Sequence, residues 1–277
     1  MLYVIGPAVA GNANLQQNDF VAGMPSPLAA LGFAGALARK INAEFGLDVD
    51  PWAVRVMPIY HAVSPSVGRV KPAAKRGARQ TMEATEIAES TTGEVILSLV
   101  VEIDGALDAA RMAEIADRMR FAGSAIFPYR PGAAVPVRRL EGKTLADLRL
   151  PRGYAMVPPA GRERGRITSF GEPETLNVLA EALTGKSEKG EGYLVPCAIG
   201  LRLLETPEEA GPRKGARDPE IPHVFAEPGV GLAELASIRT PDLARAHPSD
   251  LAARMWRWAP DATHRHVMFS EHHLACI

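Results

Sequence analysis

The sequence has little of several features that would point to a particular class of protein. Its 277 residues include only two cysteines, Cys197 and Cys276, and the chain opens without a charged and apolar leader. We therefore expect neither a disulfide framework nor secretion, and take the cytoplasm as the default location. No apolar run approaches the roughly 18 residues needed to cross a bilayer, so no membrane role is expected. Aromatic residues make up only 6% of the chain, which limits base stacking in any nucleic-acid contact.

Net charge is also almost absent. Lys plus Arg number 31 and Asp plus Glu number 32, so the net charge is -1. No global basic excess indicates a nucleic-acid partner, and any such partner must be sought in local patches. The chain is rich in apolar residues, at 47%, and in turn formers, with 25 glycines and 23 prolines. This composition favours a loop-rich α+β protein with a real core over a helical bundle.

The hydrophobic pattern predicts the order strand, helix, strand, strand, helix. The segments are a strand at 2–10 followed by a turn at 11–14, a helix at 27–45, strands at 52–63 and 94–103, and an amphipathic helix at 107–121. A ferredoxin-like or RRM-like sheet begins in this order. Three segments stay open as the remaining edge strand: 125–127, 154–158 and 193–203.

No catalytic or metal-binding motif is complete. The histidines of the C-terminal region cluster with other potential ligands, but their spacing matches no standard metal site. The cluster consists of His264, His266, His272 and His273 with Glu271 and Cys276. A solvated or partner-contacting tail is the interpretation we adopt. We expect no metal and no cofactor.

The most informative feature is a stretch without any acidic residue, from 52 to 80. It carries six cations: Arg55, Arg69, Lys71, Lys75, Arg76 and Arg79. Five of them lie between 69 and 79 among Pro, Ala and Gly, which favours an extended hairpin that lays Lys and Arg against phosphates. A solvated loop is the plain alternative, because runs of charge are commonly just exposed. We call the segment at about 64–93 the basic arm.

One histidine stands apart from the C-terminal cluster. His61 ends a predicted strand just before the basic arm, where it could serve as a general base for RNA cleavage with Tyr60 as a helper. A lone histidine at a strand end is more often structural.

Seven segments, collinear over nearly the whole chain, carry a resemblance to a known family. They are GNANLQQNDFVAGMPSPLAALGFAGAL at 11–37, PAAKRGARQ at 72–80, MRFAGSAIFP at 119–128, RGYAMV at 152–157, GYLVPCAIG at 192–200, GARDPEIPHVF at 215–225 and MWRW at 255–258. Together they resemble the Csy-two (Csy2), or Cas-five, subunits of type I-F CRISPR surveillance complexes. No segment is diagnostic alone, but their common order is specific.

The resemblance implies a RAMP fold. Its RRM-like core would occupy residues 1–165, with the basic arm as an inserted thumb hairpin. A C-terminal strand and helical extension at 166–277 would pack on that core, either as a second unit or as one continuous domain. Carried over by position, Asn12 and Asn14 would lie near the guide RNA, and Lys75, Arg76 and Arg79 would lie in the thumb. Asparagine is also a standard turn residue, so a plain turn is the alternative for Asn12 and Asn14.

The resemblance also implies a function without catalysis. Such a subunit caps the 5′ handle of the guide RNA (crRNA) and contacts a large (Cas-eight type) subunit and backbone (Cas-seven type) subunits. Contact with target DNA near the PAM stays open. Two other functions remain: a RAMP endoribonuclease that matures precursor crRNA, and a protein-interaction module without RNA affinity. A precursor-cleavage assay separates the first, and salt-dependent RNA binding excludes the second.

Overall fold

The computed structural model describes the chain apart from residues 19, 67–74, 77–81, 84–90, 106, 160–191, 206–224, 262–265 and 271–277. Its helices are α1 (Pro27–Phe45), α2 (Ala109–Ala116), α5 (Pro241–Ala244), α6 (Pro248–Ala253) and the 3-10 helix η1 (Ala146–Leu148). Its strands are β1 (Leu2–Asn14), β2 (Arg55–Pro65), β3 (Lys75–Arg76), β4 (Met82–Glu83), β5 (Thr92–Glu102), β6 (Arg120–Phe121), β7 (Ser124–Pro128), β8 (Val137–Arg139), β9 (Tyr154–Val157), β10 (Tyr193–Leu203), β11 (Ala226–Ser237), β12 (Trp256–Asp261) and β13 (His266–Ser270).

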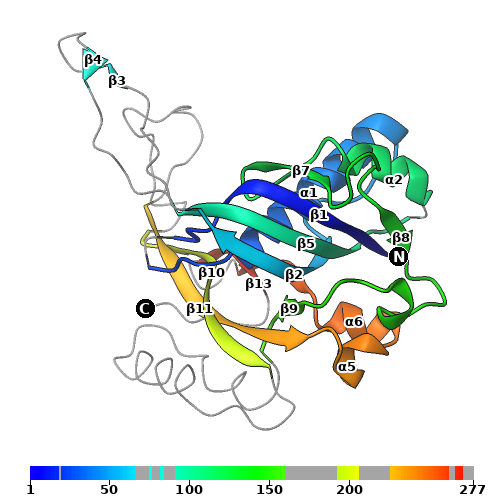
Figure 1. The fold of residues 1–277 in the computed structure, drawn as a ribbon. Helices are drawn as coiled ribbons and strands as arrows, with labels where there is room; N and C mark the ends of the chain where they lie inside the picture. The colour runs from blue at the N-terminus through cyan, green and yellow to red at the C-terminus, as the bar shows by residue number, and fades with distance from the viewer. Residues whose placement is uncertain are drawn as a thin grey trace.

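Eleven of the described strands form one sheet, and β3 with β4 forms a separate pair (Figure 1). The predicted order strand, helix, strand, strand, helix is confirmed by β1, α1, β2, β5 and α2. The neighbouring strands β7, β1, β5 and β2 follow one another in the sheet, and each pairs antiparallel with the next. All three segments left open from the sequence are strands, and the one beside β1 is β7.

Two expected boundaries are wrong, and local turns explain both. The strand expected from residue 52 begins at Arg55, because residues 51–53 form a turn in which the Asp50 side chain accepts a hydrogen bond from the Trp52 N–H at 2.8 Å. The helix expected to reach residue 121 ends at Ala116. The next residues enter a tight hairpin between β6 and β7, with Ala122 at φ 47° and Gly123 at φ 83°.

The turn expected at 11–14 is also wrong. β1 continues to Asn14, which pairs with Thr92 of β5, and a register shift between Ala10 and Ala13 lets the pairing resume after the polar residues. Extra residues in a bulge keep a strand in register while bending it. The strand therefore carries both asparagines to the end of the sheet.

The helix expected at 27–45 is confirmed by α1. Ser26 caps its start, accepting a hydrogen bond from the Ala29 N–H at 3.2 Å, and Pro27 follows at the first helical position. Gly46 ends the helix with φ 64°, a left-handed conformation that glycine adopts readily. The buried side of α1 packs on the sheet, and Phe33 meets Phe121 edge to face at 6.4 Å between ring centroids.

The sheet has two faces with different cover. α1 and α2 cover what we call the helix face, over a large apolar core. On the opposite face, which we call the outer face, residues of the 140–150 segment, α5 and α6 cover the half near the start of β1. Toward the end of β1 this cover stops, and Phe127 of β7 is 59% exposed there. The outer face is therefore half covered and half accessible.

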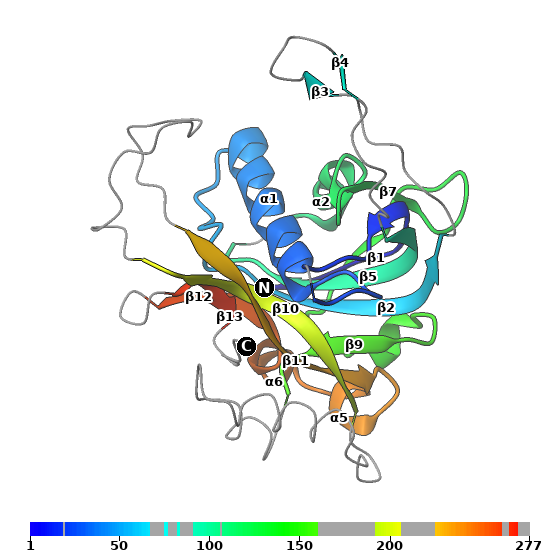
Figure 2. The same cartoon turned by 90° about the vertical axis from the view of Figure 1, so that its left-hand side faces the viewer.

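The remaining strands curl the sheet back on itself. Pairings run from β2 through β9, β11, β10, β13 and β12, and β12 returns to β2. α1 packs against β2, β10 and β12, in the angle between the two parts of the sheet (Figure 2). The fully buried Trp256 of β12 lies at this closure and donates its indole N–H to the Met156 carbonyl at 2.8 Å. The closed circuit thus joins β2 to strands from the C-terminal part of the chain.

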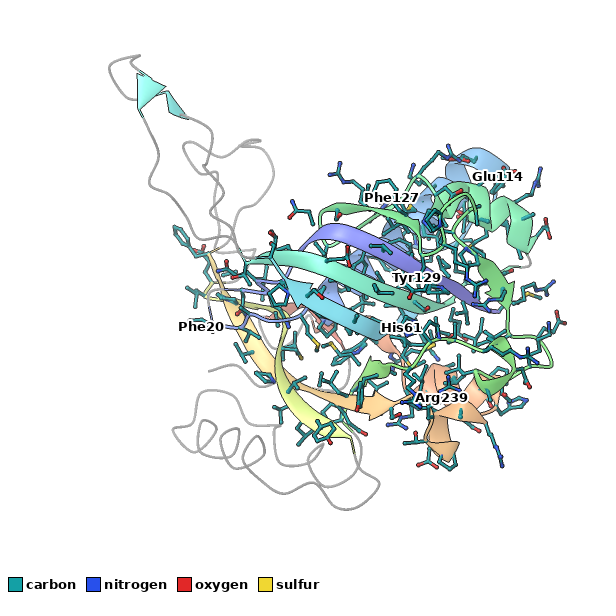
Figure 3. All side chains as sticks on the ribbon, in the orientation of Figure 1. Phe20, His61, Glu114, Phe127, Tyr129 and Arg239 are labelled. Atoms are coloured by element: carbon teal, nitrogen blue, oxygen red, sulfur yellow. The ribbon has the colours of Figure 1, made fainter. Side chains whose placement is uncertain are left out.

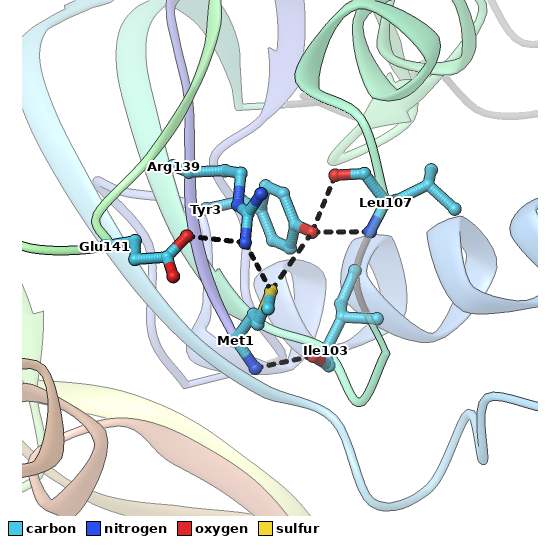
Figure 4. Close-up of polar contacts among 6 residues, drawn as sticks. All are labelled: Met1, Tyr3, Ile103, Leu107, Arg139 and Glu141. Atoms are coloured by element: carbon cyan, nitrogen blue, oxygen red, sulfur yellow. Dashed lines mark hydrogen bonds and ion pairs between the residues drawn. The ribbon is translucent and has the colours of Figure 1, made fainter.

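The start of β1 is fixed by polar contacts (Figure 4). The Met1 ammonium donates to the Ile103 carbonyl at 2.7 Å. The Tyr3 hydroxyl donates to the Leu107 carbonyl at 2.9 Å and accepts from the Leu107 N–H at 2.8 Å.

No helix in the described ranges is long and apolar enough to cross a membrane. The expected division between residues 165 and 166 falls in a segment outside the described residues and stays a prediction.

Candidate nucleic-acid interface

Three strand ends meet where the basic arm joins the sheet. Asn14 at the end of β1 pairs with Thr92 at the start of β5, and Pro65 at the end of β2 pairs with Gly93. Ser66, the first residue after β2, joins the two ends of the arm, because its hydroxyl donates to the Thr92 carbonyl at 2.7 Å. The structure therefore brings the asparagine segment and the base of the basic arm to one end of the sheet.

The described part of the arm is a short hairpin. Lys75 and Arg76 form β3, which pairs antiparallel with β4 as Lys75 with Glu83 and Arg76 with Met82. Figure 1 shows this pair apart from the eleven-stranded sheet. The other three cations expected to bind RNA here, Arg69, Lys71 and Arg79, lie outside the described residues, as do the side chains of β3.

Asn12 and Asn14 are both exposed, but they are not equivalent. The Asn14 side-chain oxygen accepts a hydrogen bond from the Gln16 N–H at 2.9 Å. This is the local bond by which an asparagine stabilises a turn, here directly after β1. Asn12 is held through its backbone N–H, which donates to the Ser124 hydroxyl at 3.2 Å. Within the described ranges the Asn12 side-chain amide has no hydrogen-bond partner, so both its donor and its acceptor face solvent.

The structure adds a cation that the sequence did not single out. Arg120 of β6 is exposed, and its guanidinium donates to the Gly123 carbonyl at 2.9 and 3.1 Å across the β6–β7 turn. The same turn is joined to β1, because the Asn14 N–H donates to the Ala122 carbonyl at 2.8 Å. A tight turn after the amphipathic helix was the signal that could have pointed to Arg120. Ala122 adopts positive φ in this turn, and alanine in a sequence does not indicate such a conformation. We call Asn12, Asn14, Ser66, Thr92 and Arg120 the arm-base surface.

Arg55 does not join this surface. It begins β2, ten residues before the strand ends at the arm, which places it roughly 30 Å from the arm along the strand. Its guanidinium lies 3.4 Å from the Glu102 carboxylate. The structure thus separates Arg55 from the other predicted RNA-binding residues and offsets its charge.

The pair proposed for RNA cleavage is split between the two sides of the sheet. Tyr60 is buried in the helix-face core, where its hydroxyl donates to the Pro25 carbonyl at 2.9 Å, and burial raises the pKa of this phenol. His61 turns to the other side and contacts the Arg152 carbonyl through Nδ1 at 3.1 Å and the Ser98 hydroxyl through Nε2 at 2.8 Å. A carbonyl can only accept, so Nδ1 carries the proton and Nε2 accepts from Ser98. Tyr60 cannot assist His61 in this arrangement.

The environment of His61 predicts an acid-sensitive contribution to stability. Desolvation by burial lowers the pKa of His61 below its ordinary value of 6.5. The unfolded chain therefore binds a proton at a higher pH than the folded chain, so stability is present above about pH 6.5 and falls as the pH drops. We expect His61→Gln to flatten the loss of unfolding free energy between about pH 7.5 and about pH 5.5. Urea titrations of both proteins at the two pH values measure it; identical losses would contradict the role of His61.

The C-terminal histidine cluster lies outside the described side chains. His266 is placed only as backbone in β13, and His264, Glu271, His272, His273 and Cys276 are not described. Among the residues that the structure describes, no group of three or more His, Cys, Asp or Glu side chains could hold a metal ion.

Two similarities to known proteins bear on the family resemblance of this chain. Residues 172–266 match the family described as CRISPR-associated protein (Cas_Csy2). The CRISPR-associated protein Csy2 of Pseudomonas aeruginosa (strain UCBPP-PA14) is 24% identical over an alignment of 300 residue positions. This alignment covers 90% of this chain and 91% of that protein. Both similarities are to Csy2. They support the resemblance drawn from the sequence, and the second one covers most of both chains.

Proposed function

We propose that the chain is a noncatalytic, Csy2-type subunit of a type I-F CRISPR complex that binds the 5′ handle of the crRNA. The observation that carries this proposal is the meeting of Asn12, Asn14 and Arg120 with the base of the basic arm at one end of the sheet. A cation that can hold a phosphate, Arg120, then lies at the same sheet end as an amide that can read a base. Phosphate contacts position a nucleic acid, and base contacts give specificity.

The fold supports the proposal in a particular way. The strand order β7, β1, β5, β2, with α1 and α2 on one face, has the connectivity expected of an RRM-like RAMP core. In this interpretation the basic arm is the thumb, inserted between β2 and β5. The sheet end then serves as a rigid platform, which a site for specific recognition requires.

The parts of the surface have separate roles in the proposal. Lys75, Arg76 and Arg79 hold the RNA backbone, as does Arg120. The Asn12 amide, which has no hydrogen-bond partner among the described residues, presents a donor and an acceptor in one planar group, and this suits the edge of an unpaired base. Asn14 contributes less, because its oxygen already accepts from the Gln16 N–H.

Protein partners follow from the same resemblance. The proposed neighbours are the large (Cas-eight type) and backbone (Cas-seven type) subunits, with target DNA near the PAM as a further contact. A net charge of -1 with a local basic arm suits a subunit that meets proteins on several faces and RNA on one.

A paired titration tests the role of Asn12. We expect Asn12→Ala to reduce discrimination between the native handle and a scrambled handle by roughly tenfold, since one good base contact is worth about 1–3 kcal/mol. Affinity for the scrambled RNA should stay nearly unchanged. Asn14→Ala should have a smaller effect on discrimination, and Gln16→Ala, an exposed residue two positions further on, serves as the matched control.

The possible results separate the alternatives. Equal loss for both RNAs would assign Asn12 to folding or to backbone contact, and no loss for either would leave it an ordinary exposed residue. Absence of any salt-dependent RNA affinity in the wild type would favour the protein-interaction module. Specific cleavage of precursor crRNA, abolished by His61→Ala, would establish the endoribonuclease instead.

A further inference from the structure

A cavity of about 430 Å³ opens near the outer face, away from the arm-base surface. It lies between the segment that joins β7 to β8 and the segment that follows η1. Its walls include Pro7 of β1, Pro136 and Pro151, with Tyr129 at its side. Its volume is within the range of about 300–1,000 Å³ typical of small-ligand sites.

The charge around the cavity has one sign. Arg130, Arg138 and Arg149 line it, and no acidic side chain is among its lining residues in the described part of the chain. The side chains of Arg130 and Arg149 are exposed and make no ion pair or hydrogen bond with any residue that the structure describes. Two reachable guanidinium groups therefore flank an otherwise apolar cavity.

The third arginine is fixed in place and has no counter-ion among the residues that the structure describes. Arg138 donates to the Leu148 carbonyl at 2.7 Å and to the Gly6 carbonyl at 2.9 Å, both neutral acceptors. Its Nε is buried and has no hydrogen-bond partner in the described part of the chain. Burial of this guanidinium leaves its charge poorly solvated and so lowers its pKa. A half-buried cation with neutral partners is stabilised by any anion that enters the cavity beside it.

The backbone at Arg149 is an independent observation. Arg149 has φ 49° and ψ 44°, the left-handed conformation that residues with a Cβ rarely adopt. Such residues collect at ligand-binding sites, where the strain positions a side chain. Glycine would satisfy this turn without strain, yet an arginine occupies it and lines the cavity.

The walls fit a planar, partly apolar group. Proline rings and the Tyr129 ring, 45% exposed, offer flat surfaces against which an unstacked base can lie. Phe127 and Tyr129, both labelled in Figure 3, lie two residues apart at the end of β7, and Tyr129 lines the cavity. Phe127 pairs with Val9 of β1, the strand that ends at Asn14. An exposed aromatic thus lies between the arm-base surface and the cavity.

We infer that this cavity binds one nucleotide of single-stranded RNA, with its phosphate on Arg130 and Arg149 and its base against the proline and tyrosine walls. Arg138 supplies fixed positive charge behind the phosphate. The inference rests on the proposed RNA-binding function but concerns residues outside the arm-base surface. A free nucleotide carries the same phosphate and base as a nucleotide within an RNA strand. The experiment must therefore distinguish these two ligands.

The test uses Arg149→Gly in the full 277-residue chain. We expect roughly tenfold weaker binding of a labelled single-stranded handle RNA, because a charge-assisted hydrogen bond to phosphate is lost. The midpoint of thermal unfolding should stay equal or rise, because glycine relieves the left-handed conformation. Arg130→Ala should weaken binding as well. Arg245→Ala, which removes an exposed cation elsewhere, should leave RNA affinity unchanged.

Two further measurements locate the ligand and its source. Ultraviolet cross-linking of the RNA, mapped by mass spectrometry, should label Tyr129 in the wild type and lose that label in Arg149→Gly. Titration with adenosine 5′-monophosphate separates the sources: binding that Arg149→Gly weakens assigns the cavity to a free nucleotide too, and no binding assigns it to a nucleotide held within a strand.

The overturning results are distinct. If Arg149→Gly binds RNA as tightly as the wild type while substitutions in the basic arm weaken binding, the cavity is not a nucleotide site and the proposed function stands. If the variant instead loses only assembly with partner proteins, the arginines hold an acidic protein segment and the inference is wrong. If the wild type binds neither RNA nor the monophosphate, both proposals fail together.

Discussion

Replacing Lys75, Arg76 and Arg79 together by alanine is expected to weaken guide-RNA binding by a few kcal/mol and to reduce the slope of log affinity against log salt by about 2. Each phosphate contact on a single strand releases roughly 0.7 counterion, so three contacts account for that change. The measurement is a binding titration at several salt concentrations.

A charge-matched variant controls this experiment. Arg111, Lys143 and Arg245 are exposed cations on the body of the protein, and their joint replacement by alanine changes the net charge equally. Its salt slope should stay near that of the wild type. Equal slopes for all three proteins would show that the basic arm does not contact phosphates.

Trp256→Ala is expected to lower the unfolding free energy by about 3–5 kcal/mol, a large part of the 5–15 kcal/mol typical of a domain. Trp256 is fully buried, its backbone pairs with Val56 of β2, and its indole N–H donates to the Met156 carbonyl. The substitution leaves a void where β12 returns to β2, and it removes the donor from a buried carbonyl. Chemical denaturation measures the loss.

Two variants divide this effect into its parts. Trp256→Phe keeps most of the volume but loses the indole N–H, and should cost about 1–2 kcal/mol. Trp258→Ala removes a half-buried ring that meets the exposed Trp52 ring at 5.7 Å, and should cost less than Trp256→Ala. A loss below about 1 kcal/mol in Trp256→Ala would mean that the closure does not depend on this side chain.

The early part of the fold was predictable because its signals are local. Ser26, Pro27 and Gly46 mark the ends of α1 in the sequence, and the apolar run that became β5 is long and rich in β-branched residues. The return of β12 to β2 was not predictable, because it joins residues two hundred positions apart through backbone pairing. Periodicity identifies a strand but does not name its neighbour.

The candidate site was predictable in its parts and not in its arrangement. Sequence reasoning placed Asn12 and Asn14 in a turn, whereas the register shift in β1 keeps both in a strand beside Thr92. It missed Arg120, because the turn that positions it contains an alanine at positive φ. It grouped Arg55 with the arm because the two are close in sequence. β2 is extended, however, and places Arg55 at the end of the strand that is far from the arm.

Gly93 lies at the foot of the basic arm, where a Cβ would come within 2.6 Å of the Ser64 carbonyl oxygen and 2.8 Å of a Leu15 methyl group. Its register partner Pro65 closes the other foot. With both feet fixed by the strand pair, the insertion is modular: for a flexible loop, doubling its length costs only about 0.6 kcal/mol of closure entropy. The reach of the arm can therefore diverge between relatives, or be redesigned, while the sheet that carries it stays the same.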